Sequence, residues 1–345
     1  MKRYQNLFKA LIRLHYSEWE YNGHMGGTDS VEQLFYQDNR ILRWPMDALK
    51  LEPFLLEMLD DVYPEPDRGV SLFAGYDADG HQAGVLRSLQ NESSDYVPGF
   101  FWRLQRENYW NVEKDAETAL APLLAQLVNV VPKDSRFWRA RIGYRVRGQS
   151  GQFDGFVGYE TFYSPYEEAA ISSPPPIDCG AGRLNRHGES LLYLASDANT
   201  ALAEVRPSTG QEVSLGRFHS TLALNVVDFT KLDIYDFCKN DKTLDNYIEL
   251  RNLGERFSAA VPPNRRQQYS LTQLCAHLVR KLDYDGIVFQ SSLAEGKNLV
   301  VFEPGNFTYE EDSGEVHHVT SVTVSTEPLK TYVKGEDYHS ERPYA

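Results

Sequence analysis

In the first third of the chain, apolar residues recur at intervals of three and four, as on one face of a helix. This pattern is found around Leu7, Leu11 and Leu14, in residues 49–63 and in residues 114–131. Pro132 follows the last of these segments and is typical of a helix end. The pattern therefore predicts a mainly helical N-terminal domain over residues 1–132.

From Arg136 onward the pattern changes to short apolar runs separated by Gly, Pro, Asp and Ser, which is typical of strands and turns. Strands are expected in residues 140–146, 191–195, 212–218, 221–229, 286–290, 298–304 and 321–326. Helices are expected between them in residues 199–205, 244–259 and 270–282. The sequence thus predicts an α+β fold whose second domain, residues 133–345, is dominated by a sheet.

Composition narrows the classes of function. The net charge of −14 argues against a broad nucleic-acid surface, because binding phosphate backbones requires clustered Lys and Arg. Without a run of about 18 apolar residues no transmembrane helix is expected, and we expect a cytoplasmic protein. Cys179, Cys238 and Cys275 lie far apart and are interpreted as thiols in a reducing compartment. No spacing of His, Cys, Asp or Glu indicates a metal site.

Candidate chemistry is concentrated between Pro174 and Pro207. Arg183 follows Gly182 in a loop, where its planar guanidinium suits a diphosphate because it can bind two oxygens at once. Glu204 lies in a short alanine-rich helix, and a carboxylate held there can stabilise positive charge that develops on a sugar ring. Together these residues predict a site for a nucleotide sugar.

This block closely resembles the RES domain family, which is named for an arginine, a glutamate and a serine. The resemblance continues over residues 269–304, where the serine of the family falls at Ser291 or Ser292. An upstream segment, residues 137–145, is similar to the opening strand of the family and contains Arg139. The three matches occur in the order that the family requires.

The resemblance implies a split β-sheet similar to that of ADP-ribosyltransferases, built around a cleft for NAD. NAD is then the substrate, and neither a metal nor a further cofactor is expected. In this interpretation Arg183 and Arg139 bind the diphosphate, Tyr193 packs against the nicotinamide end and Glu204 stabilises the cationic ribose.

The serine is expected to position this assembly by hydrogen bonding. Adjacent strand residues face opposite sides, so only one of Ser291 and Ser292 can face the cleft, and the sequence leaves the choice open. Asn298 follows a glycine–lysine turn. It is interpreted either as a secondary residue of the site or as a residue that holds the turn.

The resemblance implies an enzyme that cleaves the nicotinamide–ribose bond of NAD, as a glycohydrolase or a phosphorylase. Such enzymes act as bacterial toxins or defence effectors, with an antitoxin or regulatory protein as partner. Compact members lack a long helical N-terminal domain; this one could cover the site, sense a trigger or form a homo-oligomer. Protein ADP-ribosylation is an alternative, although Leu202 stands where many such enzymes have an acidic residue. A non-enzymatic nucleotide-binding module is the other alternative.

Overall fold

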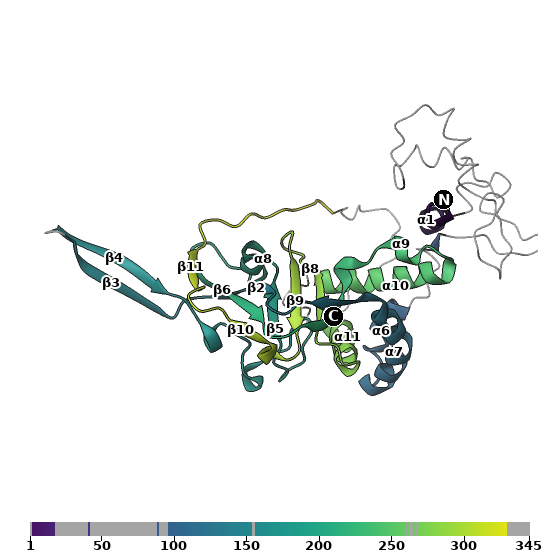
Figure 1. Cartoon of the computed structure of the whole chain (residues 1–345), viewed down its shortest axis with the longest axis horizontal. Helices are drawn as coiled ribbons and strands as arrows, with labels where there is room; N and C mark the ends of the chain where they lie inside the picture. Colours follow the sequence, from purple (N-terminus) through teal and green to yellow (C-terminus); the bar gives the residue numbers. More distant parts are fainter. Residues whose placement is uncertain are drawn as a thin grey trace, which may run out of the picture.

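The computed structural model describes residues 2–17, 41, 88–89, 96–153, 156–259, 261, 265 and 268–329. These residues form helices packed on a mixed sheet, and the predicted α+β fold is confirmed (Figure 1). The helix predicted over residues 49–63 lies outside the described residues. The N-terminal helical domain over residues 1–132 stays a prediction, because most of residues 18–95 lie outside the described residues.

The described residues form one mixed sheet of nine strands. In order across the sheet these are β1 (Val128–Val131), β7 (Leu224–Asp228), β8 (Gly286–Gln290), β9 (Lys297–Val301), β5 (Leu192–Ala195), β2 (Arg136–Ile142), β6 (Glu212–Ser220) and β10 (Phe307–Tyr309), while β11 (Glu315–His318) also pairs with β6. Strands β7 and β8 pair in parallel, and the other pairs of this sheet are antiparallel.

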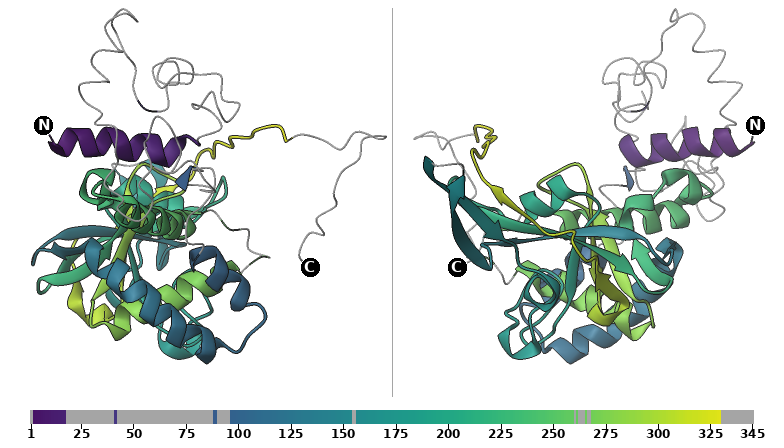
Figure 2. Two further views of the ribbon diagram at one scale, coloured as in Figure 1. Left: turned by 90° about the vertical axis from the view of Figure 1, so that its right-hand side faces the viewer. Right: turned by 60° about the vertical axis from the view of Figure 1, so that its left-hand side comes forward.

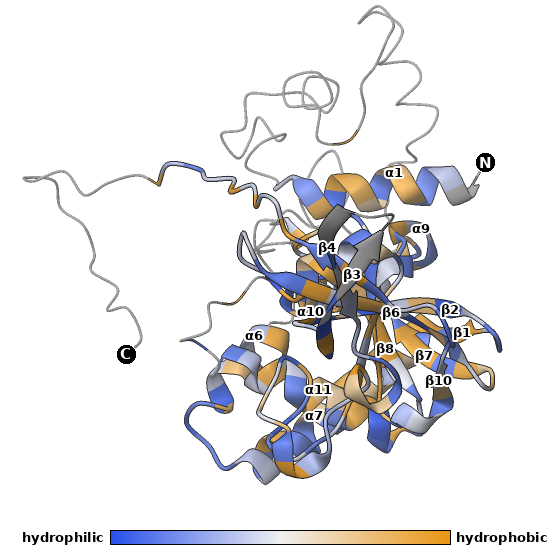
Figure 3. Cartoon of the chain, turned by 90° about the vertical axis from the view of Figure 1, so that its left-hand side faces the viewer, coloured by the Kyte–Doolittle hydropathy of each residue, from blue (hydrophilic) through white to orange (hydrophobic). Residues whose placement is uncertain are grey.

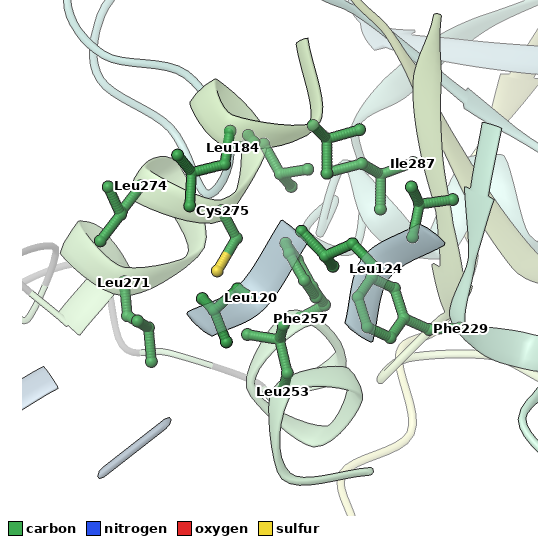
Figure 4. Packing of buried hydrophobic residues seen from close by; sticks show 14 of the residues in the cluster. Leu120, Leu124, Leu184, Phe229, Leu253, Phe257, Leu271, Leu274, Cys275 and Ile287 are labelled. Carbon is green, nitrogen blue, oxygen red and sulfur yellow. The ribbon is translucent and has the colours of Figure 1, made fainter. Parts of the chain in front are cut away.

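One face of the sheet is covered by a layer of helices, in which α7 and α11 lie side by side (Figures 1 and 2). The layer contains α6 (Tyr96–Arg103), α7 (Tyr109–Leu124), α10 (Asp241–Ser258) and α11 (Ser270–Lys281). Their apolar side chains meet Ile287 of β8 in a core that includes the fully buried Leu124, Phe257 and Cys275 (Figure 4). Burying one large apolar side chain stabilises the fold by roughly 2 kcal/mol. This core therefore holds α11 in place, and the N-terminal end of α11 borders the site described below.

A second core lies on the opposite face. Neighbouring residues of one strand enter different cores, because strand side chains alternate in direction. Phe289 of β8 packs in the helix-covered core, whereas Val288 packs with Ile171, Leu194 and Phe218 in the other. Burial on both faces explains why β8 reads as a continuous apolar run in the sequence.

The junction between β2 and β5 is short. These two strands are joined through one residue pair, Trp138 with Ala195, whereas β2 and β6 are paired along the whole of residues 136–142. Helix α8 (Ala198–Glu204) follows β5 directly and packs against β2, β5 and β6. The helix therefore places its last residue, Glu204, beside the junction of the two halves of the sheet.

The amphipathic first helix is confirmed as α1 (Lys2–His15). Its hydrophilic and hydrophobic residues alternate along the helix in Figure 3, and Leu14 is buried. The helix packs against α10, where Arg13 Nη2 lies 3.1 Å from Asp241 Oδ2. No helix in the described part of the chain is both long and apolar enough to cross a membrane.

The helix predicted over residues 114–131 is wrong at its C-terminal end. Helix α7 ends at Leu124, and residues 128–131 form strand β1, which pairs with β7. The side chains of Val128 and Val130 are exposed while Val131 is buried, which is the alternation of a strand at the edge of a sheet. Backbone pairing with β7 outweighs the helical period here, and residues 128–131 thus join the sheet of the second half of the chain.

The strand predicted over residues 321–326 is also wrong. These residues form no strand and Val324 is largely exposed, while β11 ends before them at His318. The sequence analysis also missed a hairpin made of β3 (Val146–Phe153) and β4 (Phe156–Ser164). The hairpin forms its own two-stranded sheet and projects from the rest of the fold (Figure 1).

Candidate functional site

A pocket of about 380 Å³ opens beside the junction of β2 and β5. It is bounded by β2, the loop before β5, α8, the start of α11 and the ends of β8 and β9. Its lining includes five residues expected from the sequence, Arg139, Arg183, Tyr193, Glu204 and Asn298, together with Trp138, Arg206, Tyr269 and Phe289. Segments far apart in the sequence thus meet at one concave surface.

Glu204 is held by α8 and by two side chains from other elements. The helix begins at the cap Asp197, whose carboxylate accepts a hydrogen bond from the backbone nitrogen of Thr200. At the other end of α8, Glu204 Oε1 accepts hydrogen bonds of 2.6 Å from both Ser291 Oγ and Asn298 Nδ2. Within the described part of the chain no group donates to Oε2. One carboxylate oxygen is thus fixed, while the other can face a ligand.

The structure brings Ser291, and not Ser292, to Glu204. Ser291 is buried, and its hydroxyl also accepts hydrogen bonds from the backbone nitrogens of Leu293 and Ala294. The hydroxyl of Ser292 is buried without a hydrogen-bond partner among the described residues. Because the Ser291 oxygen accepts from two backbone N–H groups, its own proton is directed at the carboxylate of Glu204. Ser291 therefore orients Glu204.

Arg183 lies in a loop whose backbone is held by side chains of α11 and whose arginine side chain is held by the carbonyl of Phe257. Thr272 Oγ1 donates to the carbonyl of Arg183, and Gln273 Nε2 donates to the carbonyl of Gly182 at 2.8 Å. The first turn of α11 thereby fixes the backbone of the loop. The Arg183 guanidinium donates to the carbonyl of Phe257 and lies 5.7 Å from the ring centre of Phe289, on the pocket wall.

Tyr193 supports the same loop through its hydroxyl. The hydroxyl donates to Asn185 Oδ1 at 2.9 Å and accepts from the backbone nitrogen of Leu184 at 3.1 Å. Burial raises the pKa of Tyr193 to about 12, so the phenol stays neutral at physiological pH. The residue lines the pocket, but its polar end is used within the protein. Packing against nicotinamide stays a prediction.

Arg139 is enclosed and donates to three backbone carbonyls. Its Nε donates to Ile171, its Nη1 to Tyr193 at 2.7 Å and its Nη2 to Ser172 at 3.3 Å. Burial lowers the pKa of this guanidinium to about 10. The side chain therefore ties β2 to β5 and to the segment that follows β4. Its expected role in binding a diphosphate stays a prediction.

Arg206 is a pocket residue that the sequence analysis missed. It follows α8 directly, two residues after Glu204, and lines the same pocket. The signal that could have found it is its position, because an arginine stands just past a helix end where glycine is usual. Within the described residues no group of three metal-ligating side chains occurs.

Comparison with known proteins identifies the family. The family model of the RES domain matches residues 144–321. This chain belongs to the RES domain family. The RES match contains Arg183, Glu204 and Ser291 and begins after Arg139.

No curated protein matches the chain. Among solved structures, this RES chain is similar to the crystal structure of the M. tuberculosis MbcT–MbcA toxin–antitoxin complex, at 15% sequence identity and a TM-score of 0.35. That similarity covers 58% of this chain and 92% of the other.

Proposed function

We propose that this protein is an NAD-consuming enzyme that cleaves the bond between nicotinamide and ribose. The observation that carries the proposal is the fixed carboxylate of Glu204, held by Ser291 and Asn298 on the wall of a pocket that also contains Arg183. A preorganised carboxylate stabilises positive charge in a transition state without having to reorganise during the reaction.

In the proposed reaction the C1′–N bond of the nicotinamide ribose breaks. The electron pair leaves with nicotinamide, which becomes neutral, and positive charge develops on the ribose. Glu204 stabilises this oxocarbenium-like state. Water then forms the new C1′–O bond and releases a proton, which gives ADP-ribose; phosphate in its place gives an ADP-ribose phosphate. No metal is required, because the leaving group is already cationic before the bond breaks.

Membership in the RES domain family supports a proposal for the biological setting. We place the protein in the cytoplasm as a bacterial toxin or defence effector that depletes NAD. An antitoxin or regulatory protein then inhibits the NAD-consuming activity.

The test is to incubate the purified full chain with NAD and to follow free nicotinamide. Glu204→Gln keeps the size of the side chain and removes its charge, so we expect release to fall by at least about 100-fold. Glu303→Gln is the control, because this exposed residue pairs with Arg280 away from the pocket. Equal release by wild type and Glu204→Gln would remove Glu204 from the mechanism.

The products identify the acceptor. Adding phosphate distinguishes a phosphorylase, which forms an ADP-ribose phosphate, from a glycohydrolase, which forms ADP-ribose. Transfer of ADP-ribose to an added protein, without free ADP-ribose, would support protein ADP-ribosylation in place of NAD degradation. Binding of NAD without any turnover would instead support a nucleotide-binding module.

A further inference from the structure

The pocket concentrates positive charge in an acidic protein. The chain carries a net charge of −14, yet the charged residues that line the pocket are Arg139, Arg183, Arg206 and one carboxylate, Glu204. The overall field of such a protein repels an anion, so an anionic ligand needs local cations to overcome it. The proposed substrate carries its negative charge on a diphosphate. The three arginines are therefore the candidate binding partners of the diphosphate.

Arg139 is the least suited of the three arginines. Its donors point at the carbonyls of Ile171, Ser172 and Tyr193, which would lose their partners if the guanidinium turned towards a ligand. A buried carbonyl without a donor is costly, so this arrangement opposes such a movement. Arg183 and Arg206 remain as the cations of the pocket.

Arg206 has a backbone conformation that a glycine would adopt more easily. Its φ is 48°, in the left-handed region, and it follows the last turn of α8, where its backbone nitrogen donates to the carbonyl of Ala203 at 3.0 Å. Glycine usually occupies this position because it has no Cβ to crowd the backbone. The chain therefore holds an arginine on the pocket wall in spite of a conformational cost.

Arg206 is also available to a ligand. The side chain is exposed, and within the described part of the chain no carboxylate lies within ion-pair distance of Arg206 or of Arg183. Arg206 approaches the pocket from α8, whereas Arg183 approaches from the loop before β5. Two guanidinium groups on different elements suit a diphosphate, which presents oxygens in several directions.

We propose that Arg206 and Arg183 together bind the diphosphate of the dinucleotide. This assignment rests on the proposed function. Arg206 is only two residues from Glu204 on the same short segment, so the anchor for the phosphates and the carboxylate that faces the ribose move as one unit. The diphosphate contact then sets the distance between the substrate and Glu204.

The test is calorimetric binding of ADP-ribose, inorganic pyrophosphate and adenosine to the full chain at low salt. Arg206→Gly removes the guanidinium and also the backbone strain, so the variant should unfold at a temperature no lower than wild type. We expect it to bind ADP-ribose and pyrophosphate about 10- to 100-fold more weakly, as expected for lost hydrogen bonds between charged groups, and adenosine equally well. Arg206→Lys, which keeps the charge, should restore part of the affinity.

Asp283→Gly is the matched control. Asp283 follows α11 in the same left-handed conformation, with φ 60°, and lies outside the pocket. This variant should bind all three probes like wild type. A normal affinity of Arg206→Gly for ADP-ribose and pyrophosphate would overturn the assignment and leave the proposed function in place. Binding of pyrophosphate but not of ADP-ribose by wild type would support the anion site and contradict the proposed function, and binding of neither would overturn both.

Discussion

The hydroxyl of Ser291 donates a hydrogen bond of 2.6 Å to Oε1 of Glu204, although 86 residues separate them along the chain. The serine follows β8 and the glutamate ends α8, so the bond joins two elements that are far apart in the sequence. Asn298 of β9 donates to the same oxygen at 2.6 Å. The carboxylate therefore has one orientation that the sheet itself determines.

Replacing Ser291 with alanine should reduce turnover more than it reduces stability. The variant leaves Glu204 with one of its two donors, so we expect the kcat for NAD cleavage to fall by about 10- to 100-fold, the effect of one hydrogen bond to a charged group. Ser292→Ala is the control, because its hydroxyl has no partner among the described residues. Steady-state kinetics of both variants give the measurement. Equal losses in the two would contradict the assigned orientation.

Arg139 should contribute to stability more than to ligand binding. Arg139→Met keeps the length of the side chain but leaves the carbonyls of Ile171, Ser172 and Tyr193 without this donor. We expect the free energy of unfolding to fall by about 2–4 kcal/mol, as for a broken buried hydrogen-bond network. Urea denaturation gives the measurement.

The control for Arg139 is Arg136→Met on the same strand. Arg136 is largely exposed and its ion pair with Glu310 is solvated, so its loss should cost less than about 1 kcal/mol. An Arg139→Met protein with normal stability but weak ADP-ribose binding would support the role that the family resemblance implies, direct contact with the diphosphate.

Much of the fold was predictable because local patterns and tertiary packing agree. The apolar runs at β8 and β9 and the helical period of α11 predict elements that the structure contains. The pattern around residues 128–131 is helical, however, and strand β1 forms there because β7, about 100 residues away, offers backbone pairing. No local pattern can reveal such a partner.

In the site, too, some features were predictable from the sequence and others depend on tertiary contacts. Glu204 and Arg183 were predicted from their residue types together with the resemblance to the RES domain family, and the structure places both on one pocket. The choice between Ser291 and Ser292 was not predictable, because it depends on the loop geometry that directs two backbone nitrogens at the Ser291 hydroxyl. Nor could the sequence show that the donors of Arg139 point at carbonyls from other segments.

Cys275 should be chemically inert in the folded protein. Burial raises the pKa of its thiol to about 12, and the side chain is fully enclosed in the helix-covered core (Figure 4). In the unfolded chain the thiol ionises near pH 9, and only the thiolate reacts with iodoacetamide. We expect no labelling of Cys275 at pH 8.5 in buffer and rapid labelling in urea, as measured by peptide mass spectrometry.

The raised pKa of Cys275 also makes the free energy of unfolding depend on pH. Because the pKa of the thiol is higher in the folded state, the unfolded chain loses this proton first as the pH rises above about 9. The contribution of Cys275 to stability is therefore complete below pH 9 and declines between pH 9 and 12. Labelling of Cys275 in the native protein at the rate seen in urea would show that the core opens readily, contrary to this expectation.

The loop that carries Arg183 should tolerate an added methyl group at Gly180 but not at Gly182. A Cβ at Gly182 would lie 2.4 Å from Asn185 Oδ1 and 3.3 Å from the hydroxyl of Tyr193, whereas a Cβ at Gly180 would meet nothing within 4 Å. The Asn185 side chain cannot yield freely, because its Nδ2 donates to the carbonyl of Gly180 at 2.8 Å while its Oδ1 accepts from Tyr193. Gly182→Ala must therefore displace the loop and move Arg183.

We expect Gly182→Ala to raise the KM for NAD by about 10-fold or more, because even small displacements of substrate-positioning residues are costly. The variant should also lose some thermal stability, because Leu184 of the same loop packs in the helix-covered core with Leu124 and Phe257. Gly180→Ala should have the KM of wild type. Identical kinetics in the two variants would mean that the contact between Asn185 and Tyr193 does not position Arg183, and that the support from Gln273 and Thr272 is sufficient.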